Sequence, residues 1–584
     1  MRRGPGREAL LLAFLVLASI ATFWPTLHAG FITDDFPIVQ MNPVVHRGEI
    51  REIFGTGWWE AVGGVGASLY RPVTVASWLP ERGPDGRVRP ERAHLDNLLL
   101  HALTGYALAF LLRRWGIGFA AASGAALLFV LHPGHVSAVG GLVGRAEILS
   151  TLFSLLALVL MADTGPWPGQ GVPSARRARL ASWGAAACVF LALGSKEGAA
   201  ALPGLLVLQE VLFRRDHLRP LVPRLAALAP SVLAVVCYAV LRLSALADAP
   251  GGPPAPLSDN PIAGLSGQAR VATALSLVPR YTQLLLWPRD LSVDQSGHVI
   301  ATEPSLASAL PLLGAAVLGA LCLVIGAALL GRAGPAAGMA AALTLLSYLV
   351  VGNLLRLVGV AYAERLFYLP SAGALALLAV GAHAFLERRP RARPALALST
   401  GALVLLALFA GRSAAAHWRS HEAVFEQAVR ATPDSPRAQF TLAMIRLEQG
   451  RLDEALSGFD RTIALWPTFA SAWYGRGVVH ARRGAFAEAA AAFAEAARLA
   501  PGDPAAAADL GVALHRAGRT EEAERQLRRT LRRFGPSANV AGELGILLAA
   551  EGRLEEARGL LAQAVAQGRR DLAPALQAAG GPPP

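Results

Sequence analysis

The chain has 584 residues, of which 54% are hydrophobic and 16% are charged, and its formal net charge is +13 at pH 7. Soluble domains carry about 25% charged residues, so this composition excludes an ordinary soluble protein and indicates a membrane protein. The arginines lie at the ends of apolar runs and form no concentrated basic face, which argues against nucleic-acid binding.

Eleven apolar runs of spanning length predict a bundle of transmembrane helices in the first 412 residues. No small-residue cleavage site follows the first run, so we expect a retained helix there and not a signal peptide. The segment 270–287 is apolar but carries Arg270 and Arg280, and we interpret it as interfacial or re-entrant. The predicted spans are 9–23, 95–112, 117–132, 147–162, 180–194, 198–213, 225–244, 305–330, 336–355, 366–386 and 394–411.

Arginines flank alternate ends of these spans, for example at Arg113, Arg176 and Arg388. Flanking arginines mark the cytoplasmic side of a membrane. The amino terminus is then cytoplasmic, and an odd number of spans leaves the residues after Arg412 on the extracytoplasmic side of the cytoplasmic (inner) membrane. The unusual polar residues of the bundle gather on that same outer side.

Small residues recur every 34 residues in the last third of the chain, which is the length of a tetratricopeptide repeat. The clearest series is Gly450, Gly484, Gly518 and Gly552.

We therefore expect an all-α chain in which a multi-spanning helical bundle precedes an α-solenoid of repeats. The predicted boundaries are 1–412 for the membrane domain and 413–568 for the repeat domain, with four clear repeats in 435–568. The sequence 569–584 ends in glycines and prolines, so we expect it to be disordered.

Two adjacent carboxylates, Asp34 and Asp35, follow the first span on the outer side. Paired acids can share a proton, which raises one of the two pKa values towards the range of a general base. Asp is also a favoured helix cap, so a purely structural role before Pro37 stays open.

A second polar group combines His132 and His135 with Arg145 and Glu147. Histidine and glutamate are metal ligands, but a His-Pro sequence at a helix end is also a common turn in which the imidazole caps carbonyls. Arg145 and Glu147 would each cost about 3 kcal/mol at a bilayer centre. They must therefore pair, lie at the interface or line a polar cavity.

The only lysine of the chain, Lys196, stands beside Glu197 between two apolar runs, and Arg71 lies in the first outer loop. The pair Glu364 and Arg365 repeats the pattern of charge at a helix mouth. Acids and cations on one face suit an anionic leaving group beside a base. A simple surface turn at Lys196 and Glu197 stays open as the alternative.

Eight polar motifs of the membrane part, from Asp34-Asp35 to Glu364-Arg365 in chain order, resemble those of the transmembrane and tetratricopeptide repeat-containing O-mannosyltransferases, which belong to the glycosyltransferase C superfamily. We expect a bacterial-type member. The chain departs from that family at Val136-Ser137-Ala138 and at Asp294-Gln295. The motifs are Asp34-Asp35, Tyr70-Arg71-Pro72, His94-Leu95-Asp96-Asn97, His132-Pro133-Gly134-His135, Gly144-Arg145-Ala146-Glu147, Ser195-Lys196-Glu197, Trp287-Pro288 and Glu364-Arg365.

The resemblance implies transfer of mannose or a similar hexose, with inversion, from a polyprenyl phosphate sugar to Ser or Thr hydroxyls of exported proteins. The repeats would recruit the protein acceptor, and Asp34 or Asp35 would act as the base. Whether a divalent metal takes part stays open. The candidates to hold the donor phosphate are Arg71, Arg145, Lys196 and Arg365, and the supporting residues are His132, Glu147, Glu197 and Glu364.

Two other classes remain. The chain could be a non-catalytic membrane scaffold whose repeats recruit an envelope partner, with the outer charges only packing the bundle. A transporter would also carry intramembrane charges, but we find no inverted repeat of broken helices. Membrane lipid is a partner in every case.

Overall fold

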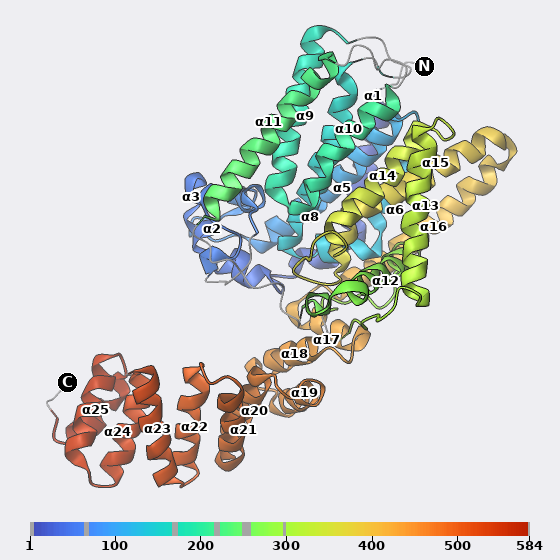
Figure 1. Cartoon of the computed structure of the whole chain (residues 1–584). Coiled ribbons are helices and arrows are strands. Elements are labelled where there is room, and N and C mark those ends of the chain that lie inside the picture. Colours follow the sequence, from blue (N-terminus) through green and yellow to red (C-terminus); the bar gives the residue numbers. More distant parts are fainter. Residues whose placement is uncertain are drawn as a thin grey trace. The chain divides into compact units, whose positions relative to one another are not determined.

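In the computed structural model, the described residues are 5–62, 69–165, 167, 173–214, 222–247, 259–295, 299–535 and 537–581. Every regular element in these ranges is a helix, and the one β-type contact there is a single bridge between Arg82 and Val88. The chain divides into two compact units, residues 1–432 and 433–584 (Figure 1). The predicted all-α fold, with a membrane bundle followed by repeats, is confirmed.

The first unit is a bundle of long helices, with the shorter ones in its connecting loops. Its α-helices are α1 (Pro5–Phe23), α2 (Pro43–Arg47), α3 (Ile50–Gly55), α4 (Pro72–Ala76), α5 (Pro90–Arg114), α6 (Phe119–Leu131), α7 (Val136–Val139), α8 (Arg145–Met161), α9 (Ala175–Ser195), α10 (Leu202–Phe213), α11 (Val222–Ala245), α12 (Gly267–Leu286), α13 (Ala309–Leu329), α14 (Pro335–Val351), α15 (Tyr368–Arg388), α16 (Arg393–Ala416) and α17 (His421–Ala431).

Within the described residues, eight helices are long and apolar enough to cross a membrane, and the bent pair Phe119–Leu131 and Pro133–Val139 would make a ninth. The predicted spans 198–213 and 336–355 fall short of this length, because α10 has 12 residues and α14 has 17. At 1.5 Å per residue these helices reach about 18 and 26 Å, against about 30 Å of hydrocarbon. The eight are Gly6–His28, Pro90–Arg114, Leu142–Thr164, Ala175–Ser195, Ala226–Ala245, Ala309–Leu329, Glu364–Arg388 and Pro390–Ala416.

The segment 196–214, which includes α10, nevertheless runs the whole length of its neighbour α8. Before α10, Lys196 pairs with Glu147 at the start of α8. After α10, Arg214 donates to the carbonyl of Ala162 at the far end of α8, at 3.2 Å. The 3-10 turn Glu197–Ala201 supplies the missing length before α10. The contacts therefore support a crossing at this point, while the total of eleven spans stays a prediction.

Small residues let the helices of the bundle pack closely. A Cβ atom added to Gly373 of α15 would lie 2.5 Å from the backbone nitrogen of Thr344 in α14, and one added to Gly338 would lie 2.5 Å from the Cβ of Ala328. Close backbone approach of this kind is typical of helix contacts in membranes. The segment 270–287 forms the single continuous helix α12, which is not among the candidate spans.

The second unit is a stack of helix pairs with the predicted period. In the turn of each of the first two pairs, Gly450 and Gly484 have a φ of 76°, a left-handed backbone that glycine adopts without strain. Other glycines let neighbouring helices approach closely. A Cβ atom on Gly511 would lie 2.5 Å from Cδ2 of Leu527. Its helices are α18 (Pro436–Glu448), α19 (Leu452–Leu465), α20 (Ala470–Arg482), α21 (Phe486–Leu499), α22 (Pro504–Arg516), α23 (Thr520–Phe534), α24 (Ala538–Ala550), α25 (Leu554–Ala566) and α26 (Ala573–Ala578).

The two compact units differ from the predicted domains at both ends of the repeats. Residues 413–432 fall in the first unit, which ends at Thr432, whereas the predicted boundary follows Arg412. The tail predicted as disordered forms helix α26, in which Leu576 packs into the core of the last repeats together with Leu572 just before it. These leucines cover apolar surface that the last helix pair would otherwise expose. Residues 582–584 lie outside the described residues.

Candidate active site

The turn that carries Asp34 and Asp35 follows the first span directly. Gly30 and Thr33 both have left-handed backbones there, with φ of 69° and 52°. Thr33 is β-branched, so its conformation is strained and has to be held by surrounding contacts. The chain then enters the short π-helix Phe36–Gln40, which Asp35 precedes.

Asp35 points into the protein and anchors this turn. Its side chain is fully buried, and its carboxylate accepts hydrogen bonds from the backbone N–H groups of Ile32 (3.1 Å), Leu142 (3.1 Å) and Val143 (2.9 Å). Burial raises the pKa of Asp35 to about 7, although the three N–H donors work against this shift. Asp35 thus joins two distant segments of the chain.

Asp34 faces the other way. Its side chain is 40% exposed, and Oδ2 lies 3.5 Å from a guanidinium nitrogen of Arg365, which is itself 30% exposed. The two residues are far apart in sequence, at the mouths of α1 and α15. Of the predicted pair of acids, Asp34 is therefore the one that an external substrate can reach.

The pair Glu364 and Arg365 shows the same division. Both lie in the 3-10 helix Glu364–Phe367, where successive side chains point about 120° apart. Glu364 is buried and its Oε1 accepts from the backbone N–H of Ser292 at 2.8 Å, while Arg365 turns outward to Asp34. One residue of the pair fixes a loop, and its neighbour stays available.

Lys196 pairs with Glu147, and both side chains are mostly buried. Burial lowers the pKa of Lys196 well below its usual range, and the positive charges of Arg71 and Arg365 add to this effect. Both cations are thus close enough to Lys196 for their fields to act on it. We call Arg71, Lys196 and Arg365, together with the carboxylates that pair with them, the charged face.

Arg71 is a second cation of the charged face. Its Nε and one terminal nitrogen donate to Oε2 of Glu197 at 3.0 and 2.9 Å, and its guanidinium lies 5.0 Å from the ring centre of Trp58. Burial alone would raise the pKa of Glu197, but the charge and hydrogen bonds of Arg71 lower it overall. Arg242 approaches the same carboxylate at 3.7 Å. Arg242 was not predicted, and its place in the last turn of an apolar helix is the signal that could have identified it.

Arg145 does not belong to the charged face. Its side chain is 1% exposed and donates to Glu81 (2.5 Å), to Oδ1 of Asn97 (2.7 Å) and to the carbonyls of Ala93 (2.8 Å) and Ser77 (3.0 Å). With its donors used inside the protein, Arg145 is a structural cation. Glu81 was missed by the sequence reasoning, although an arginine in an apolar span requires such a partner.

His132 and His135 are likewise used internally. The Nδ1 of His132 accepts from the backbone N–H of Gly134, and its Nε2 bonds to the carbonyl of Leu285 at 3.1 Å. His135 bonds to the hydroxyl of Ser371 at 2.9 Å. In the described ranges, no group of three or more His, Cys, Asp and Glu residues is arranged to hold a metal ion. These contacts match the turn interpretation of the His-Pro sequence.

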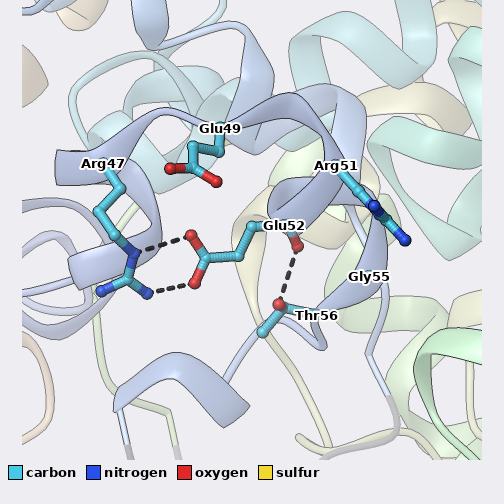
Figure 2. A pocket seen from close by; sticks show the side chains of 6 residues that line it. All are labelled: Arg47, Glu49, Arg51, Glu52, Gly55 and Thr56. Carbon is cyan, nitrogen blue, oxygen red and sulfur yellow. Dashed lines mark hydrogen bonds and ion pairs between the residues drawn. The ribbon is translucent and has the colours of Figure 1, made fainter.

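Figure 2 shows a shallow pocket elsewhere, on α2, α3 and the turn that follows. Arg47 pairs with Glu52 in it, and the hydroxyl of Thr56 donates to the carbonyl of Glu52 at 2.8 Å. None of the predicted site residues lines this pocket. Its lining is Arg47, Glu49, Arg51, Glu52, Gly55 and Thr56.

The chain is similar in sequence to two groups of known proteins. The tetratricopeptide repeat family matches residues 402–468, 442–504 and 480–542. Protein O-mannosyl-transferase F38B6.6 of Caenorhabditis elegans is 25% identical over 80% of this chain and 64% of its own length. Human protein O-mannosyl-transferase TMTC3 is 26% identical over 62% of this chain and 41% of its own length.

The chain is a relative of the protein O-mannosyl-transferases. The expected resemblance is therefore confirmed, and protein O-mannosyl-transferase Tmtc1 of Drosophila melanogaster extends it, at 26% identity over 76% of this chain and 60% of its own length. The chain thus spans less than two thirds of each of these O-mannosyl-transferases.

Solved structures with some similarity include YrrB, described as a TPR protein with an unusual peptide-binding site. It is 25% identical with a TM-score of 0.25, over 27% of this chain and 80% of that structure. MamA from Desulfovibrio magneticus has 17% identity and a TM-score of 0.25, over 26% of this chain and 85% of that structure. The relation to the O-mannosyl-transferases rests on the sequence comparisons and on the repeats, and not on these low scores.

Proposed function

We propose that this chain is a membrane glycosyltransferase that transfers mannose or a similar hexose from a polyprenyl phosphate to Ser or Thr hydroxyls of exported proteins. The observation that carries the proposal is the Asp34 and Arg365 pair, an exposed carboxylate that faces an exposed guanidinium at 3.5 Å. The names of the relatives support the hexose and the protein acceptor. The extracytoplasmic position of the site follows from the arginine pattern and stays a prediction.

The proposed reaction uses this arrangement directly. Asp34 takes the proton of the acceptor hydroxyl as its oxygen attacks the anomeric carbon, and the bond from that carbon to the phosphate oxygen breaks. The electron pair leaves with the polyprenyl phosphate, and the configuration at the anomeric carbon is inverted. Arg365, Lys196 and Arg71 hold the phosphate before and after this step, as charge-assisted donors.

The carboxylates Glu147 and Glu197 would then tune these cations. Each pairs with one of them in the absence of donor, which keeps the cations in place and offsets their mutual repulsion. Asp35 and Glu364 position their neighbours through backbone hydrogen bonds. His132 packs the turn between α6 and α7, and Arg145 holds the start of α8.

A non-catalytic scaffold is the second candidate, because Arg71, Lys196 and Arg365 each already have an acidic partner. The test is incubation of purified protein with polyprenyl phosphate mannose and an acceptor protein, followed by mass spectrometry. Addition of a hexose at Ser or Thr by the wild type, and not by the double variant Asp34→Asn, Asp35→Asn, would support the enzyme. The absence of hexose addition by both proteins would support the scaffold, and equal addition by both would exclude the two aspartates as the base.

A further inference from the structure

The segment from Trp418 to Thr432, which includes α17, packs against three of the loops that build the charged face. This segment lies within the predicted repeat domain 413–568 and within residues 402–468, which the repeat family matches. The structure nevertheless assigns it to the membrane unit. Its contacts reach the turn before Asp34 and the loop that binds Glu364, the neighbour of Arg365.

At its amino-terminal end, α17 holds the strained turn before Asp34. The backbone N–H of Thr33 donates to Nδ1 of His421, the first residue of α17, at 3.2 Å. The ring of His421 also meets Phe36 edge-on, with 5.1 Å between the ring centres. A left-handed backbone at a β-branched residue is strained and persists only where its surroundings hold it. His421 supplies that hold from a distance of almost 400 residues in sequence.

Trp418 packs on the loop that holds Asp35. A Cβ atom added to Gly140 would lie 2.9 Å from Cε3 of Trp418, and one on Gly141 would lie 3.6 Å from Cζ3. Gly141 directly precedes Leu142 and Val143, whose N–H groups bind the Asp35 carboxylate. The indole therefore fixes the donors of the anchor on the other side of the turn.

The carboxyl-terminal end of α17 holds the loop behind Arg365. The hydroxyl of Thr432 lies 3.1 Å from that of Ser292 and 3.3 Å from the carbonyl of Asp294, and its proton is shared with the carbonyl of Ala428 in α17 at 2.7 Å. The backbone N–H of Ser292 in turn donates to the buried Glu364, the neighbour of Arg365. Through this chain of contacts the end of α17 sets where Arg365 emerges.

We infer that α17 is a clamp that sets the separation of Asp34 and Arg365, and that His421 is a positioning residue of the site. A helix that the sequence assigns to the repeats thereby completes the membrane site. The inference rests on the proposed function for the roles of Asp34 and Arg365. It adds that donor phosphate and acceptor hydroxyl are brought into register by a segment that follows the last predicted span.

The test uses the full chain with substitutions at His421. In His421→Ala, kcat for transfer should fall about 10- to 100-fold, since displacement of a reacting group by about 1 Å has effects of this size. The amide oxygen of Asn can take the place of Nδ1, so His421→Asn should restore most of the rate, whereas His421→Gln should not. The matched control is His417→Ala, because His417 directly precedes this segment and its ring nitrogen contacts Arg430.

A second substitution tests the strain. Glycine adopts a left-handed backbone at little cost, so Thr33→Gly added to His421→Ala should recover part of the lost rate. If His421 only stabilised the fold, Ala, Asn and Gln would lower the rate and the melting temperature together, and Thr33→Gly would recover nothing. That result would overturn the inference.

Hydrogen exchange of the amides in residues 32–38 gives a readout that is independent of transfer. Exchange should be faster in His421→Ala and return to the wild-type rate in His421→Asn. If the wild type transfers no sugar but exchange follows this pattern, the clamp stands and the proposed function fails. If exchange is unchanged in His421→Ala, or rises while kcat keeps its wild-type value, the clamp is overturned.

Discussion

The charged face is built from pairs of neighbouring residues in which one member is buried and the other is exposed. Asp35 and Glu364 are buried and accept backbone N–H groups from distant loops. Asp34 and Arg365 turn outward and face each other. A buried carboxylate that binds backbone donors orders the chain around it, so its neighbour is presented in one fixed direction. Adjacent charges in the sequence therefore have separate roles.

The first prediction concerns the exposed acid. If Asp34 is the base, Asp34→Asn should lower turnover about a hundred-fold or more and leave donor binding nearly unchanged, because the amide cannot accept the proton. Transfer rates and binding of polyprenyl phosphate sugar by the purified protein measure both effects. Asp85→Asn, at an exposed acid of the first outer loop, is the control and should behave as the wild type. An Asp34→Asn variant with full turnover would contradict the assignment of the base.

The second prediction concerns the buried acid. Burial raises the pKa of Asp35 to about 7, whereas the carboxyl titrates near 3.8 in the unfolded chain. Between these pH values the folded state binds more protons than the unfolded state. The stability that is fully present below about pH 4 is therefore lost as the pH rises through about 7, by at most on the order of 4 kcal/mol.

The comparison variant is Asp35→Asn, whose side chain does not titrate. The melting temperature of the wild type should fall relative to that of Asp35→Asn as the pH rises from about 5 to about 8, as followed by tryptophan fluorescence in detergent. If the melting temperatures of the wild type and of Asp35→Asn changed equally with pH over that range, Asp35 would have an ordinary pKa.

At the scale of the elements, the start of α8 is the junction of the membrane unit. Arg145, its first residue, donates to residues of α5 and of the loop before it. Glu147, two residues further on, pairs with Lys196 at the end of α9. The 3-10 turn Leu142–Gly144 before α8 presents its N–H groups to Asp35. One short stretch thus orders the anchor, the structural cation and the central lysine.

The third prediction tests this junction through Gly144. A Cβ atom there would lie 2.2 Å from the carbonyl oxygen of Ala138, so Gly144→Ala must displace backbone. Overpacking of this kind costs about 1–3 kcal/mol, and a lower melting temperature in detergent should report it. The matched control is Gly198→Ala, since a Cβ at Gly198 would meet no atom within 4 Å. Equal melting temperatures for the two variants would show that the turn adapts freely.

At the scale of the whole molecule, the boundary between the units matters for function. The repeats form their own compact unit from Pro433, and the residues before it contact the charged face. A repeat stack offers a concave surface for an extended segment of a partner protein. Under the proposed function, the repeats would recruit the acceptor and the segment before them would support the site.

The fourth prediction separates these parts by truncation. Deletion of 433–584 should leave transfer to short peptides and reduce transfer to whole acceptor proteins, because only the recruiting surface is lost. Deletion of 413–584 should abolish both, since α17 is lost as well. Transfer assays with a peptide and with a folded acceptor measure the difference, while monodispersity in detergent controls for folding. Identical losses in the two truncations would contradict the division of roles.

Much of the architecture could be predicted from local properties of the sequence. Hydropathy over about 20 residues identifies spans, and a 34-residue period identifies repeats, because both depend on neighbouring residues only. The same local pattern placed Asp34, Lys196 and Arg365 at helix mouths. The number of spans was less well determined, because α10 is completed by a 3-10 turn. The start of the repeat domain was also less well determined, because α17 joins the membrane unit.

The tertiary structure decided which of these residues face one another. Burial of Asp35 depends on Val143, and the direction of Arg365 depends on the anchoring of Glu364 by Ser292. Arg145 became structural because Glu81, a residue without any motif of its own, lies beside it. Such pairings depend on the packing of segments that are distant in the chain. By itself the sequence determined which charges lie at helix mouths; only the fold decided which of them stay exposed, because exposure depends on what distant segments cover.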